Sequence, residues 1–264
     1  MAENNDKIHL MLWKNELGIL GRSNYALVSH GLEILRSYRT VDEELAVYPM
    51  LSCLALGFEQ SCKAVLSLID KDVSGHWPDV SELKRYGHSL SNLKDRTLEA
   101  IHERMSIKKH YMWLDYIYEL VSSDISIKPF IDILSDFGSG GRYYSLDLLA
   151  GSIHGTDRQG AWPSWENTVE NFIQTDPVLK KAFEDIIKSN KLEFEELNLS
   201  AHTEIAFRLQ RFYDLLIEAG IHDLLGDDGL IWYSYAQGQD KGLSKRMDLY
   251  KRQAEKNLPE RFHI

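Results

Sequence analysis

A basic segment in the middle of an otherwise acidic chain has the residue types needed to bind phosphate. Residues 83–110 contain seven Lys and Arg against three Asp and Glu, a local charge of +4 in a chain of formal net charge −10. Such a segment is typical either of a phosphate-binding surface or of a solvated helix face whose cations pair with acids elsewhere. Three histidines, which titrate near neutral pH, lie in the same segment: His88, His102 and His110.

A glycine-rich turn precedes a second candidate anion contact. Residues 138–141 read Gly-Ser-Gly-Gly and are followed directly by Arg142. Backbone amides in such a turn can form an anion-binding nest, although the Lys-Ser/Thr ending and the strand-to-helix context of a P-loop are missing. Two interpretations stay open, an anion site that includes Arg142 and a plain turn that ends a helix.

The histidines and cysteines do not have the spacing of metal ligands. His102 and His110 are eight residues apart, and His76 and His88 are twelve apart. Two imidazoles share a helix face when they are about four residues apart, and no cysteine cluster is present. The sequence also lacks a Gly-x-Ser-x-Gly nucleophile motif. We therefore predict neither a metal site nor a cofactor.

Helices must position these residues, because apolar residues recur at helical intervals along most of the chain. An all-α helical bundle is the expected fold class. Besides the helix within residues 42–69, helices are predicted at about 23–38, 89–105, 110–122, 129–137, 198–219 and 243–258. Two more helices are predicted to start at Ser164 and at Asp176-Pro177. The clearest apolar stripe lies within residues 42–69 and consists of Val47, Met50, Leu51, Leu54, Phe58, Cys62, Val65 and Ile69.

A stretch rich in glycine and polar residues, at 151–163, is the best candidate domain boundary. It divides the chain into a helical bundle at 1–150 and a helical extension of unknown role at 151–264. Two segments, 142–146 and 231–235, have the composition of short strands. The surrounding residues 226–242 contain four glycines and are expected to form a loop.

Composition and cysteine usage indicate a globular protein of the cytoplasm. Apolar residues make up 44% of the chain and charged residues 27%. No apolar run approaches the roughly 18 residues of a membrane span, and the polar N-terminus lacks the pattern of a signal peptide. Cys53 and Cys62 lie about 13 Å apart along one predicted helix, too far for a disulfide with each other. Reduced thiols fit a cytoplasmic location.

The order of these features resembles the HEPN superfamily, small helical bundles found in prokaryotic toxin–antitoxin and phage-defence proteins. The similarity covers roughly residues 23–150 and rests on two elements. One is the Glu-x-x-x-Lys of the apolar helix, Glu59 and Lys63, and the other is the His-x-Leu of the next helix, His88 and Leu90. The resemblance implies a bundle that pairs as a homodimer and, in many members, a metal-independent ribonuclease.

The ribonuclease site implied by this resemblance is an Arg followed a few residues later by His. Arg142 occupies the expected place, but Asp147 stands where the His is expected. Arg104 and His110 have the required spacing on a different helix. By the resemblance, Arg104 holds the phosphate and His110 does the acid–base work on RNA.

Four further side chains are candidates for contacts with phosphate or another ligand. The pair Arg96 and His102 has the same spacing as Arg104 and His110, with five residues between its members. RNA or a nucleotide is the partner that these contacts imply, in bacterial defence or in a toxin–antitoxin pair. The four candidates are His88, Arg96, His102 and Arg142.

The alternative is a non-catalytic helical module that binds a protein partner or a nucleotide-like ligand. The missing His after Arg142 and the acidic net charge favour it. Aromatic residues in glycine-bounded segments also favour it, because such residues often form interfaces when exposed. They are Trp162, Trp165, Trp232, Tyr233 and Tyr235.

Overall fold

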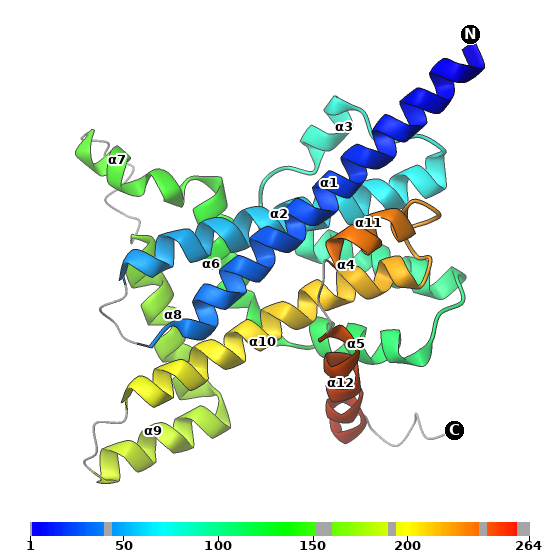
Figure 1. Cartoon of the computed structure of the whole chain (residues 1–264). Helices are drawn as coiled ribbons and strands as arrows, with labels where there is room; N and C mark the ends of the chain where they lie inside the picture. Colours follow the sequence, from blue (N-terminus) through cyan, green and yellow to red (C-terminus); the bar gives the residue numbers. More distant parts are fainter. Residues whose placement is uncertain (1, 40–43, 151–159, 190–193, 238–241, 258–264) are drawn as a thin grey trace.

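A computed structural model describes residues 2–39, 44–150, 160–189, 194–237 and 242–257. These residues are all-helical and include no strand, which confirms the predicted all-α class. Figure 1 shows the long helices α1, α2 and α10 crossing the molecule, with shorter helices around them. In chain order the elements are α1 (Ala2–Ser37), α2 (Glu44–Ser74), α3 (Val80–Arg85), α4 (Leu90–Ile107), α5 (Met112–Ser122), η1 (Ile125–Ile127), α6 (Lys128–Ser139), η2 (Gly141–Tyr143), α7 (Tyr144–Leu149), α8 (Ala161–Thr175), α9 (Pro177–Ser189), α10 (Phe194–Ile221), α11 (Gly229–Ala236) and α12 (Leu243–Asn257).

Helix α2 lies at the centre of the bundle. All eight apolar residues of its predicted stripe are buried, and α1, α4, α6, α8 and α10 pack against it. From Ala46 to Ser74 this helix has the length and composition of a membrane span, but 67% of its most apolar window is buried inside the molecule. Such burial is what the core helix of a helical domain requires.

The two cysteines of α2 have no disulfide, as predicted. Cys53 is half-buried and Cys62 is fully buried, and both thiols are free. Burial raises the pKa of Cys62 to about 12, and the nearby charge of Lys94 acts in the opposite direction. The Cys62 thiol is therefore a core group that stays protonated at neutral pH.

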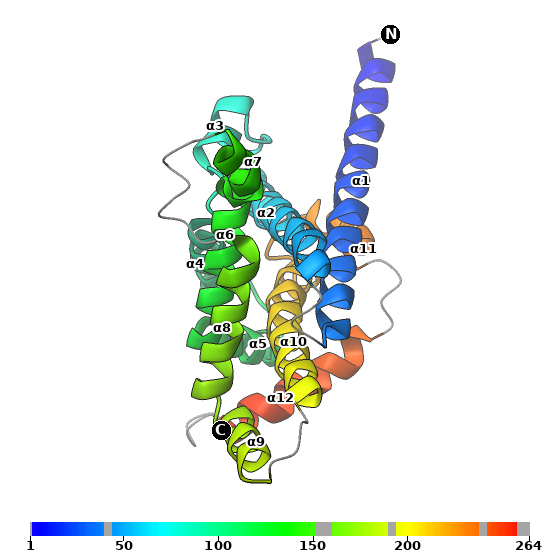
Figure 2. The ribbon, with the colours of Figure 1, turned by 90° about the vertical axis from the view of Figure 1, so that its left-hand side faces the viewer.

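Helix α10 connects the two halves of the chain through the core. Its Phe212 stacks on Phe58 of α2, with ring centroids 5.5 Å apart and an interplanar angle of 15°. Helix α10 also packs against α1, α5 and α11 (Figure 2), and one apolar cluster contains buried residues from both halves. The segments before and after the predicted boundary at 151–163 therefore share a core. Most of that boundary, residues 151–159, lies outside the described residues.

Both segments with strand-like composition are helical. Residues 231–235 belong to α11, which packs on α1 and also occupies part of the loop expected at 226–242. Residues 142–146 fall in η2 and α7. No strand in the described part of the chain is available as a partner, so an extended backbone would leave its amides unpaired, whereas a helix pairs them internally.

The aromatic residues expected at an interface are mostly inside the molecule. Trp165 and Trp232 are completely buried, Trp162 and Tyr233 are half-buried, and Tyr235 alone among the five is exposed. The expectation of an exposed aromatic surface is therefore wrong for Trp165 and Trp232. These two side chains belong to the core, because α8 and α11 each bury one face against neighbouring helices.

The stack of Phe58 on Phe212 gives a test of the shared core. We expect the Phe58→Ala and Phe212→Ala substitutions each to lower the free energy of unfolding by about 3–5 kcal/mol. Because the rings touch, the double variant should depart from additivity by about 0.5–1.5 kcal/mol. Urea denaturation of the four proteins measures both quantities. Strict additivity of the two changes in unfolding free energy would contradict a core shared by the two halves. Leu56→Ala, at a side chain that is 42% exposed, serves as the surface control.

Candidate ligand-binding cavity

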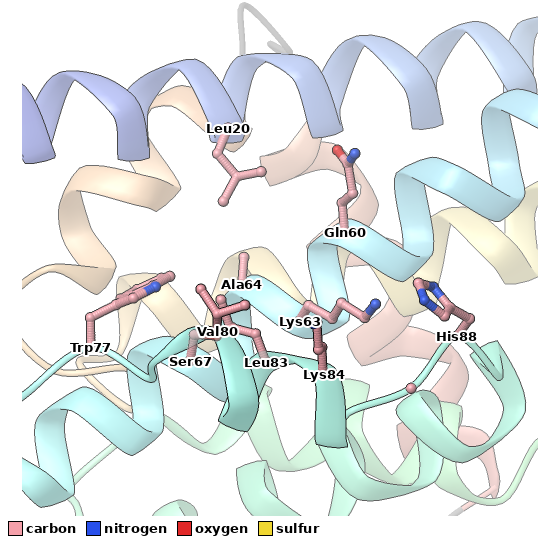
Figure 3. Close-up of a pocket in the computed structure, with 11 residues that line it drawn as sticks. Leu20, Gln60, Lys63, Ala64, Ser67, Trp77, Val80, Leu83, Lys84 and His88 are labelled. Atoms are coloured by element: carbon pink, nitrogen blue, oxygen red, sulfur yellow. The ribbon is translucent and has the colours of Figure 1, made fainter.

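A cavity of about 410 Å³ opens where α1, α2 and α3 meet. Figure 3 shows Leu20 of α1 on one side and the short helix α3 on the other, with α2 between them. A volume of this size is in the range of small-molecule sites. The cavity is therefore the first place to look for a bound ligand.

Glycine turns at both ends of the segment that carries α3 place this short helix at the edge of the core. Gly75 ends α2 at φ +83°, and its N–H donates to the Lys71 carbonyl at 2.8 Å. Gly87, at φ +73°, reverses the chain after α3. Both angles lie in the left-handed region that favours glycine. Helix α3 starts in a capping box between Asp79 and Glu82 and has no fully buried residue. It therefore serves as a wall of the cavity.

The interior of the cavity is apolar, and its single aromatic wall is held in place. The Trp77 indole makes a T-shaped contact with Trp13, with centroids 5.6 Å apart. Lys71 in turn places its ammonium 3.7 Å from the Trp13 ring centroid, a cation–π distance. These contacts fix the orientation of Trp77. The apolar lining consists of Leu20, Ala64, Trp77, Val80 and Leu83.

The rim of the cavity carries positive charge. Lys63, Lys84 and His88 line it together with the neutral Gln60, and no carboxylate occurs among the described lining residues. Figure 3 shows the Lys63 ammonium and the His88 ring side by side at the mouth. In a chain of net charge −10, the ammonium groups of Lys63 and Lys84 favour an anionic group at this opening.

A carboxylate behind the rim orients two of these groups. Glu59 Oε1 accepts a hydrogen bond from Lys63 Nζ at 2.7 Å and lies 2.8 Å from His88 Nδ1. The Glu59 side chain is 15% exposed and the His88 side chain is 75% exposed. The carboxylate favours a proton on Nδ1, so Nε2 of His88 stays available at the mouth. The two sequence elements on which the family resemblance rests thus meet at one oxygen atom.

A buried hydroxyl lies at the inner end of the cavity. Ser67 is 1% exposed, and its Oγ has no hydrogen-bond partner of ordinary geometry in the described chain. It lies near the Tyr86 hydroxyl, which donates to Asp70 Oδ2 at 2.6 Å. Burial, followed by this hydrogen bond, raises the pKa of Tyr86. The Ser67 hydroxyl is therefore enclosed beside the Tyr86 hydroxyl rather than presented to the cavity.

The two residues predicted for ribonuclease chemistry lie at another corner of the molecule. The buried Arg104 side chain donates to Asp72 and, from Nε at 2.9 Å, to the Leu224 carbonyl. His110 Nδ1 lies 3.1 Å from the Lys108 carbonyl, and its Nε2 lies 2.9 Å from Asp115 Oδ1. These contacts hold the Arg104 and His110 side chains within the α4–α5 corner, where both have structural partners.

The remaining predicted contacts are dispersed over the surface. Arg96 lies over the Tyr86 ring at 5.2 Å, His102 stacks on Tyr118, and Arg142 lies over Tyr143 at 5.0 Å. No hydrogen bond, ion pair or ring contact among the described residues joins any two of the six predicted site residues. Of the six, only His88 lines the cavity.

Sequence reasoning did not assign the other polar lining residues to a site. Lys63 lies four residues after Glu59, which is the spacing of an ordinary ion pair on a helix surface. Trp77 lies in a segment expected to form a loop. One signal was available, because Gln60, Lys63 and Ser67 recur at helical intervals and interrupt the apolar surface of α2. A polar strip on an otherwise apolar helix predicts a surface that other helices leave uncovered.

Comparisons with known proteins identify no relative of this chain. No protein-family model matches it, no curated protein matches its sequence, and no solved structure matches its fold. Among the described residues, no group of three or more His, Cys, Asp and Glu is placed to hold a metal ion.

The contacts of His110 predict a dependence of stability on pH. Burial acts to lower the pKa of His110, but the hydrogen bonds to Asp115 and to the Lys108 carbonyl outweigh it, so the pKa is raised above 6.5. A raised pKa adds stability below pH 6.5, which is lost as the pH rises through the folded-state pKa. We expect His110→Ala to be more destabilising at pH 6 than at pH 9, by about 0.5 kcal/mol. Urea denaturation at both values tests this.

The matched control for this prediction is His102→Ala, at an exposed imidazole that stacks on Tyr118. An effect of His110→Ala that grows toward pH 9 would contradict the assigned contacts.

Proposed function

We propose that this protein is a non-catalytic helical module that binds a small organic anion, of the nucleotide-like kind, in the cavity between α1, α2 and α3. The observation that carries the proposal is the combination of an apolar interior with a rim of two lysines and a histidine. The site is complete within one chain, so it does not depend on the homodimer that the family resemblance implies.

The chemistry of the lining selects for an amphiphilic ligand. An ion such as inorganic phosphate satisfies the rim but leaves the apolar interior filled with water. A neutral apolar molecule fills the interior but brings no anionic partner to the ammonium groups of the rim. A ligand with both parts gains from the hydrophobic effect and from charge-assisted hydrogen bonds.

The absence of turnover is proposed because the groups predicted for acid–base chemistry are engaged elsewhere. Both ring nitrogens of His110 face acceptors of its own chain, and Arg104 donates to Asp72 and Leu224. The ribonuclease hypothesis rests on the family resemblance, whose sequence elements are Glu59 with Lys63 and His88 with Leu90.

Removal of one rim charge tests the binding proposal. Lys84 is exposed at the rim, and we expect Lys84→Met to weaken binding of 2-naphthyl phosphate by about tenfold, since a charge-assisted hydrogen bond contributes about 1.5 kcal/mol or more. Isothermal titration calorimetry measures the affinity. The matched control is Lys128→Met on α6, where the lysine forms an ion pair with Asp132. Equal affinities of wild type and Lys84→Met would exclude this rim as the anion site.

Incubation with RNA tests the competing ribonuclease hypothesis. We expect purified wild-type protein to leave labelled tRNA and total RNA intact, because neither Arg104 nor His110 presents a free group to a substrate. Gel electrophoresis after incubation measures cleavage. A different result would replace the binding proposal with the ribonuclease hypothesis. In that result the wild type cleaves RNA, and the His110→Ala variant does not cleave it although it still unfolds cooperatively.

A further inference from the structure

We infer that the cavity selects an anion that carries an aromatic ring, and that Trp13, which lies outside the cavity lining, sets this selectivity by positioning Trp77. The inference rests on the proposed function and narrows it, because it names the class of ligand and a residue that controls its recognition. Three observations carry it: the place of Trp77 in a loop, its contact with Trp13, and the contacts that hold Trp13 in the core.

Trp77 needs a partner outside its own segment to fix its indole. It lies between Gly75, which follows α2, and Asp79, the N-cap of α3, and it belongs to neither helix. A side chain in a helix is restricted by the preceding turn, and a loop residue lacks that restriction. The orientation of the Trp77 indole therefore depends on tertiary contacts.

Trp13 of α1 supplies such a contact. The two indoles meet in T-shaped geometry, with ring centroids 5.6 Å apart and an interplanar angle of 73°. This is a preferred arrangement of aromatic pairs. Leu20, which lines the cavity on the side of α1 (Figure 3), follows Trp13 by two helical turns. Helix α1 therefore provides one wall of the cavity directly and orients the aromatic side chain of another.

The Trp13 indole is itself held by other helices. Lys71, in the last turn of α2, places its ammonium 3.7 Å from the Trp13 ring centroid. The same ammonium pairs with Asp228, the residue that precedes α11, and α11 packs on α1. Three helices thus fix Trp13, and Trp13 in turn fixes Trp77. A wall that is already ordered loses little conformational entropy when a ligand packs against it.

The indole of Trp77 is the feature of the apolar interior that can distinguish an aromatic ring from an aliphatic one. Aromatic rings attract each other through their quadrupoles, beyond the effect of buried area. The remaining apolar side chains of the lining are aliphatic and favour either kind of ring by its buried area alone: Leu20, Ala64, Val80 and Leu83. The lysines of the rim favour an anionic group, so an aryl phosphate or aryl carboxylate satisfies both preferences.

A matched pair of ligands, titrated into the intact protein by isothermal titration calorimetry, tests the selectivity: 2-naphthyl phosphate and its fully saturated counterpart, decahydro-2-naphthyl phosphate. The saturated ring system has at least as much apolar surface, so burial of area alone predicts that it binds at least as tightly. We expect the wild type to bind 2-naphthyl phosphate about two- to tenfold more tightly, which is the contribution of one aromatic pair. Trp77→Leu should remove this preference.

Substitution of Trp13 tests its role as a positioning residue. We expect Trp13→Leu to bring the ratio of the two affinities toward one, whereas Trp13→Phe, which keeps a ring, should retain most of the preference. In the Trp77→Leu background, Trp13→Leu should leave the ratio unchanged, because its effect passes through Trp77. A merely structural role of Trp13 would weaken both ligands alike and leave the ratio as it is in the wild type.

Val28→Ala serves as the control, because Val28 is a buried residue of α1 that packs near Gly57 of α2, outside the cavity lining. It should lower the melting temperature and leave both affinities unchanged. Thermal unfolding of each variant confirms that it is folded. Lys71→Met, which removes the cation over the Trp13 ring, should also reduce the ratio and carries the test if Trp13→Leu is unfolded.

The outcomes separate this inference from the proposed function. If both ligands bind equally tightly and both lose affinity in Lys84→Met, the anion site stands and the aromatic selectivity is wrong. If the wild-type preference survives in Trp13→Leu, Trp13 does not position Trp77. If neither ligand binds at millimolar concentration, the proposed function fails together with the inference.

Discussion

The structure depends on the need to bury helix α2. Its surface is apolar around most of its circumference, and an isolated helix of this composition would expose a continuous hydrophobic surface to water. The chain meets this need by packing five other helices against it, drawn from both halves of the sequence. The cavity lies along the part of α2 that is polar, where Gln60, Lys63 and Ser67 face the space between α1 and α3. Burial of the apolar faces and the position of the cavity along this polar strip are therefore two consequences of one helix sequence.

The strongest local signals were sufficient to predict much of the fold. The stripe on α2 is buried throughout, Ser89 caps α4, and α9 begins at Pro177 with the Asp176 carboxylate accepting two backbone N–H groups. The errors occurred where tertiary packing determines the local structure. Residues 231–235 have β-branched and aromatic character, yet they form a helix because Trp232 is buried within a helical core. Helix α1 begins some twenty residues before the expected start at Ser23, in a segment without a clear apolar period.

The candidate site could be predicted only in part, because its residues come from separate turns of the chain. His88 stands out by residue type, and its position at the rim agrees with a contact to an anion. Trp77 and Lys63 have unremarkable local contexts, and their shared role depends on how α3 is placed. The same limit applies to Arg104, whose partner Asp72 lies 32 residues earlier at the end of α2. Spacing along the sequence identified a possible Arg–His pair, but it contained no information on the carboxylates that these side chains meet in the folded chain.

The separation of α3 from the core has a consequence for how the protein can change. Because α3 has no fully buried residue and is joined to the bundle through Gly75 and Gly87, substitutions at the exposed Val80 and Lys84 alter the cavity wall at little cost in folding stability. The exposed residues of α3 that line the cavity thus form a cassette that varies while Trp77 and Tyr86 keep the segment attached to the core. A designer seeking new specificity, or a lineage under selection for it, can vary this cassette while α2 and its neighbours stay constant.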